Sequence, residues 1–428
     1  MNRYDVIIIG AGPAGCATAL FLQSRGYRVV VLDQARFPRD KVCGEFISPA
    51  ADPILEELGL MDAIEQTQPV RLRGVAISAY GNEALCIDYP PHPQDARPMT
   101  SLSLPRFVFD HLLVKRLRHA GIELREAHKV DDLIFENGSV VGVKVRDGDQ
   151  APLTLKARMV VDAGGRNSIA LRRLNLKQGS ARQRKIALAA HWTGAQLPHN
   201  YCTMHISPPG YTGMARVGDD LLNVVLVVDS KLVKGRERTS FYTEAVLSNP
   251  LRRKYLAGAV LKGPVRAVDS LSYRVKPVPC GGLLLVGDAT GFIDPFTGEG
   301  IYLSLRSAQL AGEVLDRAFR SKQFSREVVQ RYEGLRLREF HKKFTLSRIL
   351  QRLIYNPWLC RRVVTALAAN PDLAQQLVGV LGDYMPAEQV VSFRFLVKTI
   401  LAGLRPQSGK RGCKNFDFRR LLKSADPE

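Results

Sequence analysis

Hydrophobic residues in the first part of the chain follow the pattern of a strand, a helix and a second strand. Residues 6–9 form a continuous β-branched run, and residues 29–32 form a second apolar run. Between them, apolar residues recur at helical spacing up to Gly26, which stands where a helix C-cap belongs. A short return from helix to strand is typical of a right-handed parallel crossover. The pattern therefore predicts a βαβ unit at the N-terminus.

Similar patterns continue along the rest of the chain. Residues 36–53 are loop-like, whereas residues 186–226 alternate between apolar and polar positions with glycine turns, as in a sheet that lines a pocket. The C-terminal part carries repeated amphipathic helix patterns. Their breakers are Pro357, Pro371 and Pro386. Further strands are predicted at 75–77, 85–87, 130–135, 140–145, 159–162 and 283–286, and further helices at 54–60, 106–119 and after residue 300.

The composition is that of a globular protein with an excess of positive charge. Hydrophobic residues make up 46% and charged residues 24%, and the net charge of +20 favours a partner or substrate that carries negative charge. Lys and Arg are scattered, and the chain has no zinc-finger spacing, RNP-like strand or long basic arm, so we do not expect nucleic acid binding. A dinucleotide, an anionic membrane surface or an acidic carrier would also match the charge.

Cysteine usage and the apolar runs indicate a cytoplasmic protein. The seven cysteines are widely separated and form no CxxC pair, so we predict neither a disulfide framework, nor a metal site, nor an iron–sulfur relay. The N-terminus opens directly on a strand and leaves no room for a secretory signal. Because no apolar run reaches the ~20 residues that span a bilayer, any membrane contact is expected to be peripheral.

Three glycines form a dinucleotide-binding signature between the first strand and the first helix. Gly10 permits the tight turn, Gly12 allows a pyrophosphate to approach the backbone, and Gly15 allows helix and strand to pack closely. The helix N-terminus supplies amide donors to the phosphate charge. Asp33, at the end of the second strand, is placed to accept hydrogen bonds from the ribose hydroxyls. This turn alone suits NAD as well as FAD. Its candidate cofactor-binding residues are Gly10, Gly12, Pro13, Ala14, Gly15, Asp33 and Gln34.

A second signature follows the apolar strand at 283–286 and leads into a helix. It resembles the Gly-Asp segment of the large flavoprotein family that includes aromatic hydroxylases, flavin halogenases and geranylgeranyl reductases. The resemblance implies that Asp288 holds the ribityl chain of FAD and that the following helix points its dipole at the flavin N1/C2 carbonyl. The candidate cofactor-binding residues here are Gly287, Asp288, Gly298, Gly300 and Ile301.

The segment 36–49, which reads RFPRDKVCGEFISP, is the most discriminating stretch. It resembles the loop of geranylgeranyl reductases that brings a K-x-C-G segment to the flavin. The resemblance implies that Lys41, Cys43 and Gly44 lie by the isoalloxazine ring, and we take Cys43, Lys41 and Glu45 as the candidate catalytic residues. Halogenases usually have Val-Gly-Glu at this place, so Cys43 favours the reductase branch.

Two further segments also resemble the family. Arg106 and Asp110 match its R-x-x-F-D helix start, where the arginine reaches the flavin diphosphate, and Val130 is a further candidate cofactor-binding residue. In the segment 161–172, Gly164 stands where the NAD(P)H-dependent hydroxylases have an aspartate, which disfavours that branch. The W-x-W-x-I-P signature of halogenases and the Y-x-W-x-F-P segment of the reductases are both missing.

Together the patterns and the resemblance predict a mixed α/β (α+β) flavoprotein. It contains a Rossmann-type FAD-binding domain, an interleaved β-sheet substrate domain and a helical C-terminal region. We expect the FAD-binding domain at 1–70, 99–175 and 270–335, the substrate domain at 71–98 and 176–269, the helical region at 336–405 and a basic tail at 406–428.

The expected reaction is flavin hydride transfer that reduces or oxidises a carbon–carbon bond of a small apolar, prenyl- or polyketide-like substrate. One alternative is an FAD-dependent monooxygenase or hydroxylase, and another is an electron-transfer flavoprotein without an organic substrate. A second GxGxxG is absent, so the sequence does not identify the external electron donor.

Overall fold

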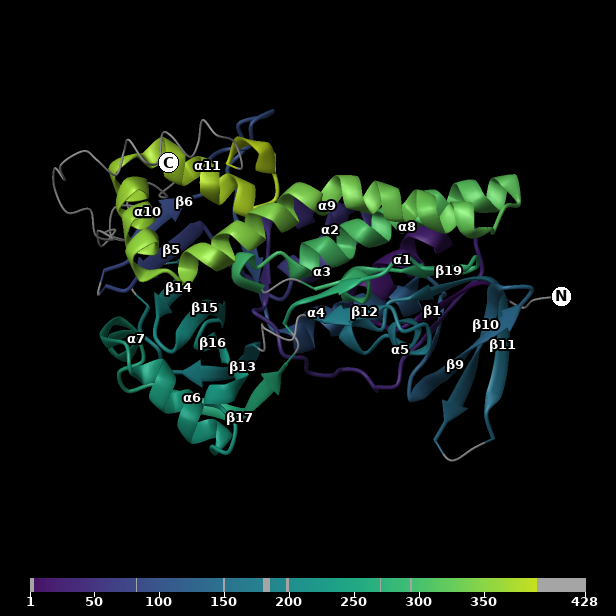
Figure 1. Cartoon of the computed structure of the whole chain (residues 1–428), viewed down its shortest axis with the longest axis horizontal. Helices are drawn as coiled ribbons and strands as arrows, with labels where there is room; N and C mark the ends of the chain where they lie inside the picture. Colours follow the sequence, from purple (N-terminus) through teal and green to yellow (C-terminus); the bar gives the residue numbers. More distant parts are fainter. Residues whose placement is uncertain are drawn as a thin grey trace, which may run out of the picture.

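The computed structural model describes residues 4–81, 83–148, 151–179, 185–197, 200–269, 271–292 and 295–390. It contains two large sheets that lie side by side, and the long helix α9 (Arg326–Ile354) runs from one to the other (Figure 1). This arrangement confirms the predicted fold class. The predicted basic tail and residues 391–405 of the predicted helical region lie outside the described residues.

The first sheet contains the N-terminal strands. Its parallel part aligns β8, β2, β1, β11 and β19, while β10 and β9 extend it as antiparallel strands. Strands β1 and β2 are covered on both faces, so their continuous apolar runs are almost wholly buried. The bounds are β1 (Tyr4–Ile9), β2 (Val29–Leu32), β8 (Glu123–Arg125), β9 (His128–Glu136), β10 (Ser139–Asp147), β11 (Leu153–Asp162) and β19 (Leu283–Leu285).

Helix α1 (Pro13–Gln23) connects β1 to β2 and packs against α8 (Gly300–Ser321). The chain leaves α1 through Gly26, whose φ of 85° lies in the left-handed region that favours glycine. The N-terminal βαβ unit is therefore present as predicted. The other helices in the chain before strand β13 are α2 (Asp52–Glu57), α3 (Met61–Glu65), α4 (Arg106–His119) and α5 (Ile169–Arg173).

The second sheet combines strands from two distant parts of the sequence. Its order is β17-β13-β16-β15-β14-β5-β6, and β5 and β14 form its parallel pair. Helices α6 (Arg238–Leu247) and α7 (Pro250–Tyr255) cover one face, and the helices that follow α8 cover the other (Figure 1). The bounds are β5 (Gly74–Ala79), β6 (Leu85–Asp88), β13 (Lys185–Thr193), β14 (Cys202–Ser207), β15 (Gly210–Gly218), β16 (Leu221–Asp229) and β17 (Val260–Val268).

Two small sheets connect the larger parts. One aligns β3 (Phe46–Ile47), β7 (Ser101–Ser103) and β4 (Val70–Leu72), and the other pairs β12 (Lys177–Gly179) with β18 (Tyr273–Val275). Strand β3 directly follows the predicted K-x-C-G loop, so this loop is anchored between the two large sheets.

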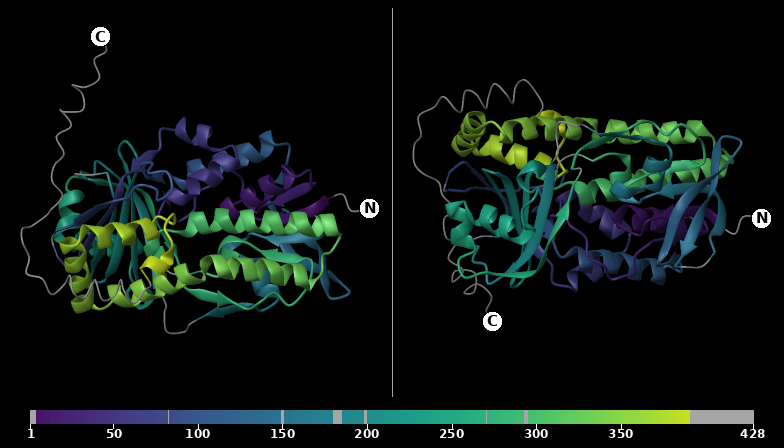
Figure 2. Two further views of the ribbon diagram at one scale, coloured as in Figure 1. Left: turned by 90° about the horizontal axis from the view of Figure 1, so that it is seen from above. Right: turned by 60° about the horizontal axis from the view of Figure 1, so that its bottom comes forward.

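The C-terminal helices are separated at the prolines. Pro357 and Pro371 occupy the first turns of α10 (Pro357–Ala369) and α11 (Pro371–Leu381), where a missing amide is tolerated. The side chains of Asn356 and Asn370 cap these helices. Seen from above, α8 and α9 run side by side (Figure 2). The boundary expected at residue 336 falls inside the continuous helix α9. Among the described residues, no helix is long and apolar enough to span a membrane.

Candidate functional site

The glycine turn lies between the carboxyl end of β1 and α1, and its three glycines have different environments. A Cβ on Gly10 would lie 2.7 Å from the Ala163 carbonyl oxygen, and one on Gly15 would lie 1.8 Å from the Gly10 carbonyl oxygen. Both glycines are therefore required by the fold. A Cβ on Gly12 would meet only Arg39 Nη2, at 3.8 Å, and would point into the cavity that Gly12 lines. The free space at Gly12 fits a phosphate group.

The N-terminus of α1 faces the same cavity. Its N-cap is Gly12, which offers no side-chain cap, so the first amides of the helix remain available to a phosphate. Asp33 is buried and holds the turn in place: its carboxylate accepts hydrogen bonds from the backbone amides of Ala11 (2.7 Å) and Ala35 (2.8 Å). Gln34 is exposed beside it, and Val130 is buried in β9.

The main cavity is where most of the predicted site residues meet. Its empty volume is about 1020 Å³, counting the part that opens to solvent. Gly10, Gly15, Asp33, Gln34, Glu45, Val130 and Gly287 do not line this cavity. The predicted residues that do line it are Gly12, Pro13, Ala14, Lys41, Cys43, Gly44, Arg106, Asp288, Gly298, Gly300 and Ile301.

Charged groups lie on the wall that the Rossmann-type domain contributes. Removal from solvent lowers the pKa of Lys41, and the positive charge of Arg106 lowers it further. Asp288 lies close to Lys41, since both adjoin Gly165; burial raises the pKa of its carboxyl group, and the nearby Lys41 and Arg166 partly oppose this rise. The cavity thus places a recessed lysine and a recessed aspartate side chain where a polar cofactor could contact them.

Arg106 is held by the helix that it begins. Its Nε and Nη2 donate to the two carboxylate oxygens of Asp110, both at 2.8 Å, and Asp110 also pairs with Arg39 at 3.0 Å. Burial would lower the pKa of Arg106, but Asp110 and the Cys43 thiol more than offset this, so the pKa is raised. The guanidinium therefore stays charged beside Cys43 in the cavity wall.

The loop that carries Cys43 is tied to the second sheet by two hydrogen bonds. Asn223 Nδ2 donates to the Cys43 carbonyl oxygen at 2.8 Å. One carboxylate oxygen of Glu45 accepts from the Arg106 amide at 2.9 Å, and the other contacts His191 Nε2 at 2.7 Å. The hydrogen bond with Glu45 raises the pKa of His191. Glu45, taken from the sequence as a catalytic candidate, thus lies behind the cavity wall, and its contacts suit a positioning role.

The sequence interpretation missed His191 and Asn223. They face each other as cross-strand partners in β13 and β16, and they lie 146 and 180 residues from their partners in the loop. Each belongs to a strand whose alternating pattern is equally typical of ordinary sheet residues. No local signal in the sequence distinguishes them.

The structure explains why residue 164 is a glycine. A Cβ at this position would lie 2.9 Å from Asp162 Oδ1, which accepts the Gly164 amide hydrogen bond at 2.8 Å. Asp162 is fully buried and also accepts from the Ser168 hydroxyl and the Ala170 amide. The aspartate that hydroxylases carry at the place of Gly164 would not fit this turn without a shift of the backbone.

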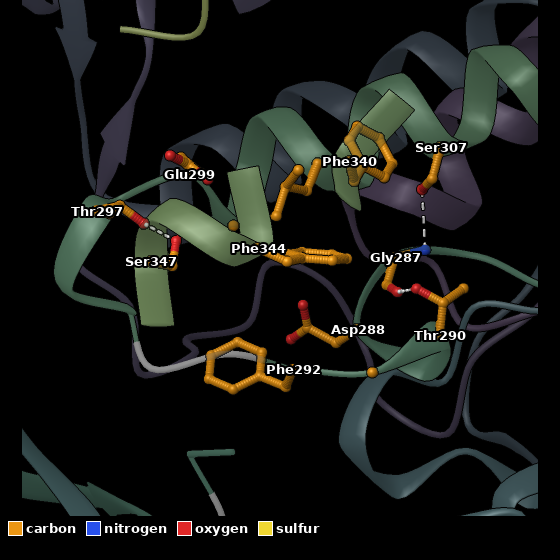
Figure 3. Close-up of a pocket in the computed structure, with 13 residues that line it drawn as sticks. Gly287, Asp288, Thr290, Phe292, Thr297, Glu299, Ser307, Phe340, Phe344 and Ser347 are labelled. Carbon is orange, nitrogen blue, oxygen red and sulfur yellow. Dashed lines mark hydrogen bonds between the residues drawn. The ribbon is translucent and has the colours of Figure 1, made fainter. Parts of the chain in front are cut away.

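A second, smaller pocket adjoins the main cavity behind Asp288. Figure 3 shows Phe340 and Phe344 of α9 on one side of it and Asp288 and Phe292 on the other. Glu299 also lines it; burial and the nearby Asp383 raise the pKa of its carboxyl group, which Lys343 partly opposes.

Lys343 forms an ion pair with Asp383, and both side chains are buried or nearly so. This pair ties α9 to the chain segment after α11. Phe340 and Phe344 were not predicted as site residues, because the α9 sequence shows only a general amphipathic pattern, and Glu299, just before α8, was not predicted either.

Comparisons with known proteins agree with this geometry. Residues 3–340 match the family model described as the FAD binding domain. The chain is 25% identical to the digeranylgeranylglycerophospholipid reductase of Methanocella arvoryzae, over 89% of this chain and 100% of that protein. It is 27% identical to the 1H-pyrrole-2-carbonyl-[peptidyl-carrier protein] chlorinase of Pseudomonas fluorescens, over 78% of this chain and 80% of that protein.

The fold is similar to the structure of the flavin-dependent brominase Bmp2, with a TM-score of 0.76 and 20% identity over 89% of this chain and 93% of that one. The flavoprotein resemblance and the FAD prediction are thus confirmed. The narrower assignment to the geranylgeranyl reductase branch is not, because halogenases are prominent among the relatives and the structural neighbours.

Proposed function

Because the chain belongs to the FAD binding domain family, we propose that this FAD-dependent oxidoreductase transfers a hydride between the flavin and a carbon–carbon double bond of an apolar, prenyl- or polyketide-like substrate. The alternatives differ in what the reduced flavin meets: an alkene, molecular oxygen or a redox partner protein.

The observation that carries this proposal is the apolar wall opposite the charged residues. Among the described residues, the second sheet and the loop after it contribute no charged side chain to the cavity. An apolar substrate gains free energy by leaving water for such a wall, whereas a polar one would lose hydrogen bonds there. The sheet and this loop contribute Ala187, Val225, Val268 and Leu271, and Phe292, from the segment after Asp288, adds a further apolar side chain to the cavity lining.

The chain's own residues divide the work between cofactor and substrate. FAD, when bound, supplies or accepts the hydride. Gly12 and the α1 amides would hold its phosphates, and Asp288 its ribityl chain. The Cys43 side chain lies at the cavity wall and would give a proton to the carbon that does not receive the hydride, so that two hydrogens add across the double bond. Solvent would then return a proton to Cys43.

A second candidate is oxygen-dependent halogenation or hydroxylation. It is supported by the similarity to the chlorinase and to the brominase fold. In that reaction the same apolar wall would hold an aromatic or pyrrole-like substrate. We prefer alkene reduction to halogenation because Cys43, the residue that distinguishes the reductase-like loop, lines the cavity.

The test is a reoxidation experiment on the FAD-loaded protein. The flavin is photoreduced without oxygen and then mixed either with a polyprenyl alkene or with aerated buffer that contains a pyrrole or a phenol together with chloride or bromide. Fast reoxidation by the alkene, with a product two hydrogens richer, supports the proposal. A halogenated or hydroxylated pyrrole or phenol, formed only in the aerated mixture, would overturn it in favour of the second candidate. Reoxidation only by an electron-transfer protein, without an organic product, would overturn both.

A further inference from the structure

The turn between α9 and α10 lies within a basic stretch of the sequence. From Phe340 to Pro371 the chain contains six Lys and Arg residues and no Asp or Glu. Two of these cations are neutralised within the fold, since Lys342 pairs with Glu388 and Lys343 with Asp383. The remaining four have no carboxylate partner among the described residues, and they are Arg348, Arg352, Arg361 and Arg362.

Large apolar side chains are exposed at the same place. Trp358 is 67% exposed, Ile349 47%, Tyr355 45% and Leu359 40%. The Arg362 guanidinium lies 5.6 Å from the centre of the Trp358 ring. We name these four apolar residues and the four arginines the α9–α10 corner. In Figure 1 this turn lies at the end of the molecule far from the N-terminus.

This combination is unfavourable in water and favourable at a lipid interface. An exposed tryptophan and tyrosine leave apolar surface in contact with water, whereas at the headgroup level of a bilayer their apolar bodies are desolvated and their polar atoms stay wet. Arginines around such a cluster match the phosphates of anionic lipids. The charge and the exposed side chains therefore point to the same partner.

The opposite side of the same helical segment packs in the core beside the cavity wall. Leu346, Leu350 and Ile354 of α9 belong to the hydrophobic core that includes the cavity-wall residues Ala187 and Phe292. The corner and two residues of the apolar wall thus adjoin the same hydrophobic core.

We propose that the α9–α10 corner docks on the surface of an anionic lipid bilayer, with Trp358 and Tyr355 at the headgroup boundary. The docking follows from charge and exposure alone. That it brings an apolar substrate from the bilayer to the cavity rests on the proposed function. Two other occupants compete for the surface: the chain segment 391–428, and a second copy of the protein.

The test uses the FAD-loaded full chain and vesicles of phosphatidylcholine with or without phosphatidylglycerol. We expect co-sedimentation only with phosphatidylglycerol, weakened by added salt. Arg352→Gln combined with Arg362→Gln should lower partitioning about 25-fold, since each cation near an anionic surface contributes about fivefold. The matched control is Lys231→Gln with Lys234→Gln. These two exposed lysines flank Leu232, itself 44% exposed, next to α6 on the other face of the second sheet. The control should bind like the unchanged protein.

Tryptophan emission locates the contact. The chain has two tryptophans, and Trp192 is 4% exposed, so a blue shift on vesicle binding reports Trp358 and should be missing in Trp358→Ser. Absence of vesicle binding at low salt, or an equal loss in the lysine control, would overturn the proposal. The proposal would also be overturned if Trp358→Ser left vesicle binding intact and instead converted a dimer to monomers. The same holds if Trp358→Ser left vesicle binding intact and instead released the segment 391–428.

The binding measurement needs no turnover, so it is independent of the reaction. Vesicle binding without alkene-driven reoxidation would reject the proposed function and leave the docking surface standing. Alkene-driven reoxidation without vesicle binding would reject the docking surface and leave the proposed function standing.

Discussion

Replacing Gly12 with valine should weaken FAD binding without unfolding the protein. Gly12 has φ −80° and ψ −177°, an extended conformation that valine adopts readily. The nearest atom to a Cβ at this position is the flexible end of Arg39, at 3.8 Å. The new side chain would therefore meet no backbone atom and would fill the cavity volume that the cofactor phosphates require.

The size of the effect follows from that geometry. Forcing extra methyl groups into a filled site costs about 1–3 kcal/mol. The dissociation constant of FAD should therefore rise about 5- to 150-fold. Because the space is empty without the cofactor, the melting temperature of the FAD-free protein should not change. Gly15→Ala is the contrasting variant: its Cβ would lie 1.8 Å from the Gly10 carbonyl oxygen, a backbone clash that no side-chain rotation relieves, so the fold itself should be lost.

The assay compares FAD-free proteins by thermal melting and then titrates them with FAD, following flavin fluorescence. Gly12→Val should melt like the unchanged protein and bind FAD weakly, and Gly15→Ala should fail to give a cooperative melt. Full FAD occupancy in Gly12→Val at the wild-type affinity would refute the placement of the phosphates at this turn.

Three other variants test the residues around the cavity. Cys43→Ser should retain FAD and its melting temperature but slow single-turnover reoxidation by an alkene ~10²-fold; an unchanged rate would remove the proton-donor role. In His191→Gln, the ion pair with Glu45 is lost. Because the folded pKa of His191 is raised, its stabilisation is fully present below the unfolded pKa of about 6.5 and disappears as the pH rises through the folded value. Denaturant unfolding at several pH values should thus show a deficit that shrinks with pH, and a deficit that grows would contradict the sign. Lys343→Met leaves the buried Asp383 without its cation and should cost about 3–5 kcal/mol in unfolding free energy; an unchanged melting temperature would argue against this tie.

The sequence by itself determined the parts of the protein whose physics is local. The N-terminal βαβ unit follows from apolar runs and glycines within about thirty residues, because strand burial, helix periodicity and the left-handed turn at Gly26 each depend on near neighbours. At the glycine turn, the φ of 98° at Gly10 and the clash of a Gly15 Cβ with the Gly10 carbonyl oxygen are local, whereas the clash at Gly10 comes from Ala163, which only the sheet brings close.

Only the tertiary structure decided which side chains meet at the cavity. The pairing of β13 with β16 sets His191 beside Asn223, and the packing of the two large sheets brings both against the Cys43 loop. Alternation along a strand predicts that one face is buried, but it does not predict which residues pack against that face. For the same reason, the Glu45 carboxylate could be predicted to lie near the Cys43 loop, whereas its hydrogen-bond partners, the Arg106 amide and His191, could not. Those contacts depend on strand register and on how separately folded layers pack, and neither leaves a pattern in the sequence around Glu45.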